Sequence, residues 1–218
     1  MARDGVVALV SGGLDSLCLL ERLLARRVPI VPLYVRCGLA WEAVELWHVR
    51  RWFTKLSRSA LKPLRIVRLP LQSLYGPHWS LTGRAVPSRT SQDTEVYLPG
   101  RNVFLLSCAG LTAATVGYHT LAMGVLAGNP FGDARPEFLR AFGRSLSQAL
   151  SHRLAVEAPM RRLTKAQLIA AHPSLPYALT FSCLQPVGRA HCGRCNKCGE
   201  RQHAFIAAHV ADPTAYAA

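Results

Sequence analysis

Short apolar runs alternate along the chain with longer segments in which leucines and other apolar residues recur at helical spacing. A continuous apolar run is typical of a strand buried on both faces, and a helical repeat is typical of a segment that buries one side. The apolar runs lie at 5–10, 29–35, 64–69, 119–126 and 153–159. The helical segments lie at 14–27, 41–57, 101–117, 135–151 and 164–172. This alternation predicts an α/β fold, a doubly wound parallel sheet of about five strands with helices on both faces.

Two segments depart from the alternation. Residues 72–95 are polar and rich in Pro, Gly and Ser, which predicts a long loop of the kind that often serves as a lid or binding element. Residues 173–218 contain a cysteine cluster and a final helix. We expect 1–172 to form the α/β domain, and 173–218 to form a small C-terminal segment packed as part of the same unit.

Composition and charge restrict the class of protein. Half of the 218 residues are hydrophobic, which favours a globular domain with a three-layer core. The formal net charge of +14 favours anionic partners, but the basic pairs are scattered and also fit a solvated surface, so we expect no nucleic-acid partner. No window approaches the ~18 apolar residues of a membrane span. The first ten residues lack the pattern of a signal peptide, so we expect a cytoplasmic protein with no membrane partner.

The stretch VALVSGGLDS, residues 7–16, ends a predicted strand in two glycines, an acid and two hydroxyls. In doubly wound sheets a ligand binds beyond the carboxyl ends of the strands, where this loop lies. Gly12 and Gly13 permit a tight turn, while Ser11, Ser16 and the first N–H groups of the next helix offer donors to an anion. The patterns of dinucleotide sites, Walker loops and nucleophile elbows do not fit here. The alternative is a glycine pair that binds nothing.

Four cysteines near the C-terminus follow the spacing C-x8-C-x2-C-x2-C. They are Cys183, Cys192, Cys195 and Cys198. Four thiolates at such spacing make a closed tetrahedral zinc site, which is structural because it leaves no open position. An iron–sulfur cluster is the alternative. His191 and His203 are interpreted as polar surface groups or as neighbours of the site.

The segment SGGLDS matches the S-G-G-x-D-S loop of ATP pyrophosphatases, and the resemblance implies an adenine nucleotide alpha hydrolase-like fold that splits ATP between its α and β phosphates. The implied nucleotide-binding residues are Ser11, Gly12, Gly13, Leu14, Asp15 and Ser16. The resemblance also implies catalytic roles for Asp15, as a polar or Mg²⁺-linked group, and for Lys165 in LTKAQL, as the group that neutralises phosphate charge. Mg²⁺ is expected to accompany ATP.

Five segments appear together in one order: SGGLDS, LPGRN, DARPEF, LTKAQL and TFSC…HCGRCNKC. This combination resembles the 7-cyano-7-deazaguanine synthase family over nearly the whole chain. The resemblance implies an ATP-dependent carbon–nitrogen ligase with one structural Zn²⁺ per chain, in the pathway to queuosine. It would activate 7-carboxy-7-deazaguanine as an acyl-adenylate, form the amide with ammonia and dehydrate that amide to the nitrile. It also implies a homodimer.

The resemblance assigns four acceptor-binding residues. Arg101 and Asn102 match the P-G-R-N segment of the family, and Asp133 and Arg135 match its D-C-R-P-E-F segment, with Ala134 in place of Cys. An Arg beside an acid suits a carboxylate and a purine-like edge. Two regions depart from the family: YVRCGLAWE replaces its Gln-Arg/Lys-His cluster after the second strand, and LAGNPFG replaces its Ser-Gly-Tyr-Pro segment.

These departures leave alternatives for the function. One is a related ligase that adenylates another carboxylated acceptor or attaches a deazaguanine to a protein. Another is a tRNA-modifying enzyme with the same loop, which would use the basic surface. A third is a nucleotide-binding module without catalysis, against which the intact Ser11, Asp15 and Lys165 count.

Overall fold

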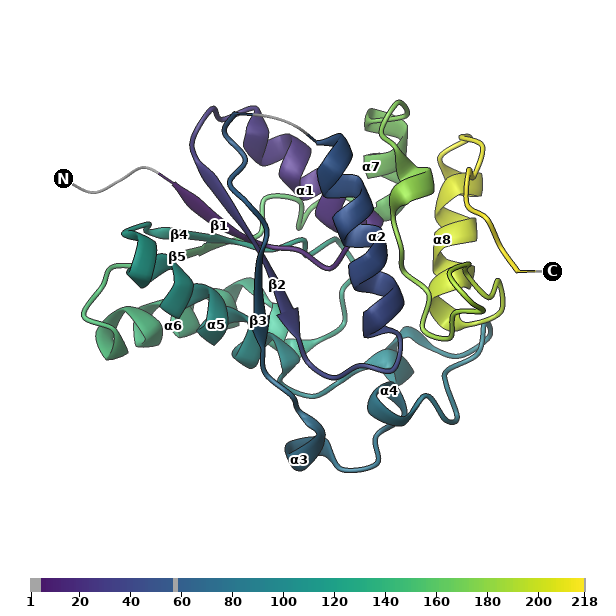
Figure 1. Cartoon of the computed structure of the whole chain (residues 1–218), viewed down its shortest axis with the longest axis horizontal. Coiled ribbons are helices and arrows are strands. Elements are labelled where there is room, and N and C mark those ends of the chain that lie inside the picture. The colour runs from purple at the N-terminus through teal and green to yellow at the C-terminus, as the bar shows by residue number, and fades with distance from the viewer. Residues whose placement is uncertain (1–4, 57–58, 218) are drawn as a thin grey trace.

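The computed structural model describes residues 5–56 and 59–217, and it contains one five-stranded sheet in the order β3-β2-β1-β4-β5 (Figure 1). All four neighbouring pairs are parallel. The strands are β1 Val6–Leu9, β2 Ile30–Arg36, β3 Arg65–Arg68, β4 Thr120–Ala122 and β5 Ala155–Glu157. The predicted α/β fold with a parallel sheet is therefore confirmed.

Helices cover both faces of the sheet (Figure 1). The eight α-helices in the described residues are α1 Leu14–Leu24, α2 Glu42–Lys55, α3 Gln72–Tyr75, α4 Trp79–Thr82, α5 Arg101–Val116, α6 Pro136–Ala149, α7 Lys165–Ala171 and α8 Asn196–Ala207. Helices α1, α2, α7 and α8 contribute to one apolar cluster, and α5 and α6 contribute to the other. The three-layer arrangement brings the C-terminal helix α8 against α7, beside the start of α1.

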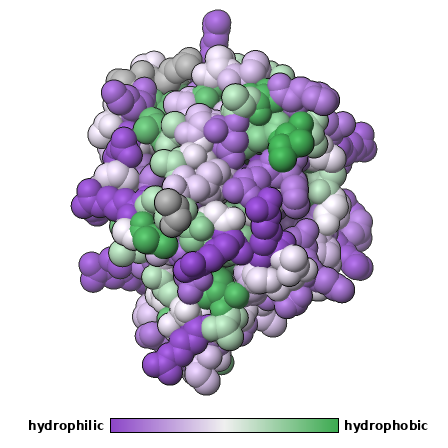
Figure 2. All heavy atoms as spheres, turned by 90° about the vertical axis from the view of Figure 1, so that its right-hand side faces the viewer, coloured by the Kyte–Doolittle hydropathy of each residue, from purple (hydrophilic) through white to green (hydrophobic). Residues whose placement is uncertain are grey.

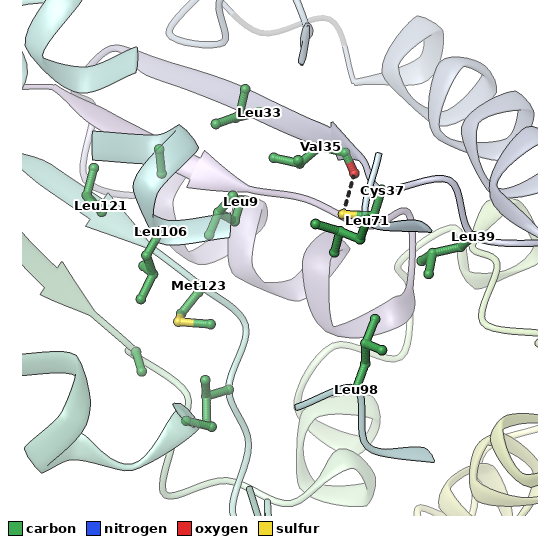
Figure 3. Close-up of a cluster of buried hydrophobic side chains, with 14 of the residues drawn as sticks. Leu9, Leu33, Val35, Cys37, Leu39, Leu71, Leu98, Leu106, Leu121 and Met123 are labelled. Carbon is green, nitrogen blue, oxygen red and sulfur yellow. Dashed lines mark hydrogen bonds between the residues drawn. The ribbon is translucent and has the colours of Figure 1, made fainter. Parts of the chain in front are cut away.

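Successive residues of β1 point alternately into the two apolar clusters, one on each face of the sheet. Val7 and Leu9 pack with α5, whereas Val6 and Ala8 pack with α1 and α2. This two-residue alternation is what a strand buried on both faces requires, and it explains why the run is apolar throughout. The α5 side of the core is shown in Figure 3, where the Cys37 thiol donates a hydrogen bond to the carbonyl oxygen of Val35 at 3.7 Å.

The same core reaches the carboxyl end of the sheet, where ligands bind in this fold class. Leu39 and Leu98 belong to the cluster in Figure 3 and also line the cleft described below. The hydrophobic core thus continues directly into the floor of the cleft, so the residues around it are held by core packing.

Several predicted boundaries differ from the structure. The predicted strand at 119–126 is only three residues long as β4, because the chain turns away after Ala122 while Met123 and Val125 remain buried. The predicted loop at 72–95 contains the short helices α3 and α4. The predicted helix at 41–57 ends at Lys55, and residue 57 lies outside the described residues, as do residues 1–4 of the N-terminal segment.

Candidate functional site

The loop after β1 makes a tight turn that only glycine accommodates well. Gly12 has a φ of +76°, and a Cβ at this position would lie 2.5 Å from Cγ2 of Val49 on α2. The turn is fixed by Ser16, whose Oγ accepts a hydrogen bond from the backbone N–H of Ser11 at 2.9 Å. The carbonyl oxygen of Gly12 accepts one from the N–H of Phe181 at 2.9 Å. Helix α1 then begins at Leu14, so its first N–H groups face the loop.

A cleft of about 390 Å³ opens beside this loop, at the carboxyl ends of β1, β2 and β4. Four residues of the predicted nucleotide loop line it, and they are Ser11, Gly13, Leu14 and Asp15. Gly12 and Ser16 instead hold the turn in shape from behind. The structure thus brings the predicted loop to the wall of a cavity that a ligand can enter.

Lys165 faces the loop across the cleft. It is the first residue of α7, behind the capping box that Thr164 and Gln167 form, as the sequence predicts. Its Nζ lies 3.5 Å from Oδ2 of Asp15 and 2.6 Å from Oε1 of Glu200. Burial acts to lower the pKa of Lys165, but these two carboxylates outweigh it and raise that pKa above its usual value. The ammonium group is therefore charged at neutral pH.

Glu200 bridges two lysines. Its second oxygen, Oε2, lies 2.7 Å from Nζ of Lys197, which also lines the cleft. Burial acts to raise the pKa of Glu200, but the ammonium groups of Lys165 and Lys197 lower it to about 2. The carboxylate holds both lysines at the cleft, where they can face a phosphate group.

Asp15 has one oxygen without a partner. Its Oδ2 contacts Lys165, whereas its Oδ1 is buried and accepts no hydrogen bond in the described part of the chain. Burial raises the pKa of Asp15, and the charge of Lys165 opposes that rise. An unpaired carboxylate oxygen beside a phosphate site fits a hard cation such as Mg²⁺, which takes oxygen ligands.

The four predicted acceptor residues are placed differently from one another. Arg101 lines the cleft, and its Nε is buried without a hydrogen-bond partner. Asn102 and Asp133 bond to each other: Oδ2 of Asp133 accepts from the backbone N–H of Asn102 at 3.0 Å. This contact ties the start of α5 to the turn before α6 and so supports Arg101. Arg135 is exposed at the N-cap of α6 and does not line the cleft.

Another part of the cleft lining combines aromatic rings with a buried acid. Trp41 and Trp79 stack with ring centroids 5.8 Å apart, and both line the cleft. Glu45 on α2 also lines it and is 7% exposed. Its Oε2 accepts a hydrogen bond from the hydroxyl of Tyr34 at 2.5 Å. Burial raises the pKa of Glu45 to about 7.

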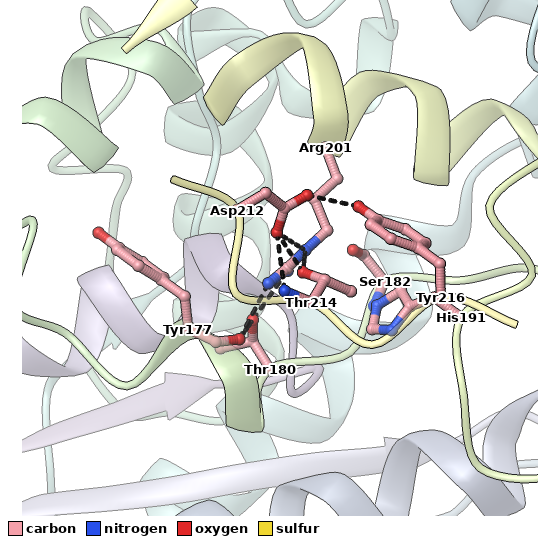
Figure 4. A network of polar contacts seen from close by, with 8 residues as sticks. All are labelled: Tyr177, Thr180, Ser182, His191, Arg201, Asp212, Thr214 and Tyr216. Carbon is pink, nitrogen blue, oxygen red and sulfur yellow. Dashed lines mark hydrogen bonds and ion pairs between the residues drawn. The ribbon is translucent and has the colours of Figure 1, made fainter. Parts of the chain in front are cut away.

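A buried guanidinium supports the remaining side of the cleft (Figure 4). Arg201 donates to Oγ1 of Thr180 at 2.8 Å and to the carbonyl oxygen of Tyr177 at 2.9 Å. From the C-terminal segment, Oγ1 of Thr214 accepts from Nε of Arg201 at 2.6 Å and donates to Asp212. Burial lowers the pKa of Arg201. The network fixes the segment around Phe181 and Ser182 that lines the cleft.

The four predicted cysteines form one buried cluster. The sulfur atoms of Cys183, Cys192, Cys195 and Cys198 all lie within 4.8 Å of one another. The distances Cys183–Cys195 and Cys192–Cys198 are 3.9 and 4.0 Å. A tetrahedral site with Zn–S bonds of about 2.3 Å requires sulfur atoms about 3.8 Å apart, so the donor set fits zinc closely. The cluster can hold a metal ion.

Backbone N–H groups point at these sulfur atoms. Those of Gln185 and Cys192 contact Sγ of Cys183, each at 3.3 Å, and that of Leu184 contacts Sγ of Cys195 at 3.4 Å. Such contacts stabilise negative thiolates around a metal. The neighbouring His191 is buried, which corrects its interpretation as a surface group, and its Nε2 accepts from the N–H of Ser182. His203 is exposed.

Sequence reasoning missed several residues of the cleft. These are Lys197, Glu200 and Arg201, which line the cleft. They lie next to the cysteines in the sequence, and the cysteine spacing alone was used to interpret this segment. A signal existed, because a Lys-x-x-Glu pair two residues from a metal ligand places opposite charges on one face of a helix. Glu45 and Trp79 carried no local signal, since their proximity arises only from the fold.

The face that carries α8 and the C-terminal segment is largely hydrophilic (Figure 2). Hydrophobic side chains are scattered over it rather than gathered in one patch. None of the helices in the described part of the chain combines the length and the hydropathy needed to cross a bilayer.

Comparisons with known proteins identify relatives over nearly the whole chain. The sequence profile of the family described as queuosine biosynthesis protein QueC matches residues 5–209. A curated protein of Anaeromyxobacter dehalogenans, named 7-cyano-7-deazaguanine synthase, is 36% identical, with 99% of this chain and 97% of that protein covered. A protein of Thiobacillus denitrificans with the same name is 34% identical over 97% of both chains.

A solved structure shares the fold. The crystal structure of a 4-thiouridine synthetase–RNA complex with bound ATP matches with a TM-score of 0.52 and 17% sequence identity. The match covers 94% of this chain and 50% of that one. At this identity the likeness concerns the fold alone. The profile match over most of the length and the full-length relatives, taken with the loop and cysteine cluster, show that the chain belongs to the queuosine biosynthesis protein QueC family.

Proposed function

We propose that this protein is a 7-cyano-7-deazaguanine synthase, an ATP-dependent ligase that converts 7-carboxy-7-deazaguanine and ammonia to the nitrile. The observation that carries the proposal is the contact between Asp15 of the S-G-G-x-D-S loop and Lys165, 3.5 Å apart at the wall of a single cleft. The names of the full-length relatives support the choice of acceptor.

The loop residues are proposed to hold the pyrophosphate part of ATP. Ser11, Gly13 and the start of α1 offer hydroxyl and N–H donors, and Lys165 and Lys197 offer positive charge. A carboxylate oxygen of the acceptor attacks the α-phosphorus, the bond to the bridging oxygen breaks, and pyrophosphate leaves. Charge that develops on the leaving group is stabilised by lysines already fixed by Glu200, so little reorganisation is needed.

The acyl-adenylate is then proposed to react with ammonia. Nitrogen attacks the carbonyl carbon and AMP leaves with the carboxyl oxygen, which gives the amide. A second ATP activates the amide oxygen in the same way, and loss of AMP and a proton gives the nitrile. Both activations use the same loop, because each is an attack of an oxygen on an α-phosphorus.

Two metal ions are proposed as partners of this chain. The four-cysteine cluster is proposed to hold one structural Zn²⁺, whose role is to fix the segment around Ser182 and the start of α8. Mg²⁺ is proposed to accompany ATP; the unpartnered Oδ1 of Asp15 could hold it, and the ion would neutralise phosphate charge. We further propose a cytoplasmic homodimer, because ATP is available in that compartment and the family resemblance implies a dimer.

The test is an assay with ATP, Mg²⁺, ammonium and 7-carboxy-7-deazaguanine, in which pyrophosphate release and product mass are measured together. The proposal expects two pyrophosphates for each nitrile formed. A matched pair of variants, Asp15→Asn and Asp93→Asn, separates the loop from another acid that lines the same cleft. Asp15→Asn should abolish release, and Asp93→Asn should retain most of it. Wild-type protein that forms neither pyrophosphate nor nitrile would contradict the proposal.

A further inference from the structure

One wall of the cleft contains two stacked aromatic rings. Trp41 lies at the N-cap of α2, and Trp79 is the first residue of α4, within the long connection between β3 and α5. Their rings are inclined by only 19°, and Trp79 is only partly buried. Stacked indoles that remain accessible at a cavity wall are suited to a flat aromatic ligand.

A carboxyl group with neutral hydrogen-bond partners lies in the same wall. Glu45 accepts from the Tyr34 hydroxyl on β2, and the Trp41 side chain also lowers its pKa as a hydrogen-bond partner. Arg101 on α5 lowers the pKa by attraction and Glu42 raises it by repulsion, but burial dominates. Glu45 and Arg101 form no ion pair within the described residues, so each keeps capacity for a ligand.

Glu42 provides an instructive contrast on the same helix. Its two carboxylate oxygens accept from Nε of Arg36 at 2.7 Å and from the N–H of Gly38 at 2.9 Å, and it does not line the cleft. Glu42 is therefore satisfied by the protein and holds the turn after β2. Glu45, in contrast, lines the cleft and has only two neutral hydrogen-bond partners among the described residues, the Tyr34 hydroxyl and the Trp41 side chain, which leaves part of the acceptor capacity of its carboxylate for a ligand.

We propose that Glu45 is a specificity-determining residue that accepts two hydrogen bonds, from the ring N–H and the amino group of a guanine-like acceptor stacked on Trp41 and Trp79. The inference rests on the proposed function and names how that site selects its acceptor. With its carboxyl group directed at the phosphate loop, the acceptor points its six-membered ring, which carries both donors, away from the loop. Adenine offers one donor beside one acceptor on that edge, so an ionised Glu45 does not match it.

The first experiment compares two acceptors by calorimetric titration, with a non-hydrolysable ATP analogue present. The acceptors are 7-carboxy-7-deazaguanine and the analogue that lacks the amino group. Wild-type protein should bind the parent compound about 10- to 100-fold more tightly, the usual range for the loss of one hydrogen bond to a charged group. In Glu45→Gln this ratio should fall below about threefold, because the Gln amide presents its own donors to the ligand.

Two further variants separate edge recognition from other effects. Glu42→Gln is the matched control and should keep the wild-type ratio, because Glu42 does not reach the cleft. Trp79→Ala should weaken both acceptors about 5- to 50-fold and leave their ratio unchanged, because stacking does not depend on the amino group. Loss of the ratio in Trp79→Ala with no effect in Glu45→Gln would overturn the assignment.

The remaining outcomes separate failure of the inference from failure of the proposed function. Glu45→Gln that binds the ATP analogue more weakly but keeps the acceptor ratio would assign Glu45 to the adenine, which overturns the inference while the proposed function stands. Wild-type protein that binds neither acceptor would overturn both. If Glu45→Gln does not fold, titrations of wild-type protein at pH 7 in buffers of different ionisation enthalpy provide the test. A pKa of about 7 predicts release of about half a proton when two donors bind, and no release would overturn the inference.

Discussion

Two parts of the cleft differ in how their charged groups are paired. We call them the phosphate end, with Asp15, Lys165, Lys197 and Glu200, and the acceptor end, with Trp41, Glu45, Trp79 and Arg101. At the phosphate end, a chain of charged contacts runs from Asp15 through Lys165 and Glu200 to Lys197, and within this described chain of contacts only Oδ1 of Asp15 lacks a partner. At the acceptor end, Glu45 has neutral partners and Nε of Arg101 has none among the described residues. A paired network is fixed before any ligand arrives, whereas unpaired polar groups can be completed by a ligand. Under the proposed function, this difference would suit one end to ATP and the other to a particular acceptor.

The largest effect is expected from loss of the cysteine cluster, which supports both ends at once. Cys195→Ser should lower the melting temperature by at least about 10 °C, because a closed thiolate site contributes directly to folding. Differential scanning calorimetry measures the shift, and elemental analysis should find one zinc per wild-type chain. Cys108→Ser on α5 is the control and should melt within a few degrees of the wild type. Equal melting of both variants would contradict a structural metal.

Loss of Lys165 should disable only the phosphate end. Lys165→Met is expected to slow pyrophosphate release by about 10²- to 10³-fold, because one preorganised positive group is removed and Asp15 and Glu200 then repel each other. Single-turnover release of pyrophosphate measures the effect, and acceptor binding should be preserved. The exposed Lys62 gives the control Lys62→Met, which should be fully active. A rate within tenfold of the wild type would show that Lys165 does not act on the phosphates.

The pH dependence of stability should reveal the buried carboxyl at the acceptor end. Burial raises the pKa of Glu45 from 4.5 to about 7, so the folded state binds this proton more tightly than the unfolded state does. Its contribution to the free energy of unfolding therefore decreases as pH rises from 4.5 to 7, by about 3 kcal/mol in total. Urea denaturation at pH 4.5 and pH 8 measures the free energy of unfolding. In Glu45→Gln this free energy should not show the decrease that Glu45 causes in the wild type.

The control for that measurement is Glu157→Gln, at a half-exposed ion pair with Arg26 on the surface. It should follow the wild-type pH profile closely, since exposed pairs contribute little. Identical pH profiles for wild type and Glu45→Gln would mean that the Glu45 carboxyl is solvated. The acceptor end would then resemble the phosphate end more than the structure indicates.

The smallest effect is expected at the C-terminal segment that supports the phosphate end from behind. Asp212→Ala removes the acceptor of both Thr214 and Tyr216 and should cost about 1–3 kcal/mol of unfolding free energy. Urea denaturation measures the loss. Glu137→Ala, at a solvent-exposed pair with Arg140, is the control and should be neutral. No difference between the two variants would show that the network in Figure 4 does not support the fold.

The geometry of the loop after β1 and of the cysteine cluster was easier to predict from the sequence than that of the aromatic wall, for a physical reason. Ser11, Gly12 and Asp15 act through one continuous turn, and the four cysteines act through fixed short spacings, so local sequence contains their geometry. The parallel sheet followed from the same local logic, since strands buried on both faces are apolar throughout. The roles assigned to Asn102, Asp133 and Arg135 in binding the acceptor stay predictions.

The acceptor end depends on contacts between distant segments. Trp41 and Trp79 meet because α4 folds back over the start of α2, and no periodicity in a polar connection signals such a contact. Glu45 reads in the sequence as a surface acid of a helix, yet the Tyr34 hydroxyl and the neighbouring sheet bury it. The strand at 119–126 was predicted too long because buried loop residues such as Val125 have the same hydropathy as strand residues.

The most direct test of the proposed chemistry uses acceptor labelled with ¹⁸O in both carboxyl oxygens. Attack of the carboxylate on the α-phosphorus, followed by loss of AMP at each of the two steps, transfers one labelled oxygen to each AMP. Mass spectrometry of AMP from wild-type protein with ATP and ammonium should therefore find one ¹⁸O in each of two AMP molecules per nitrile. AMP without label, or label found in pyrophosphate, would contradict activation of the acceptor at this cleft.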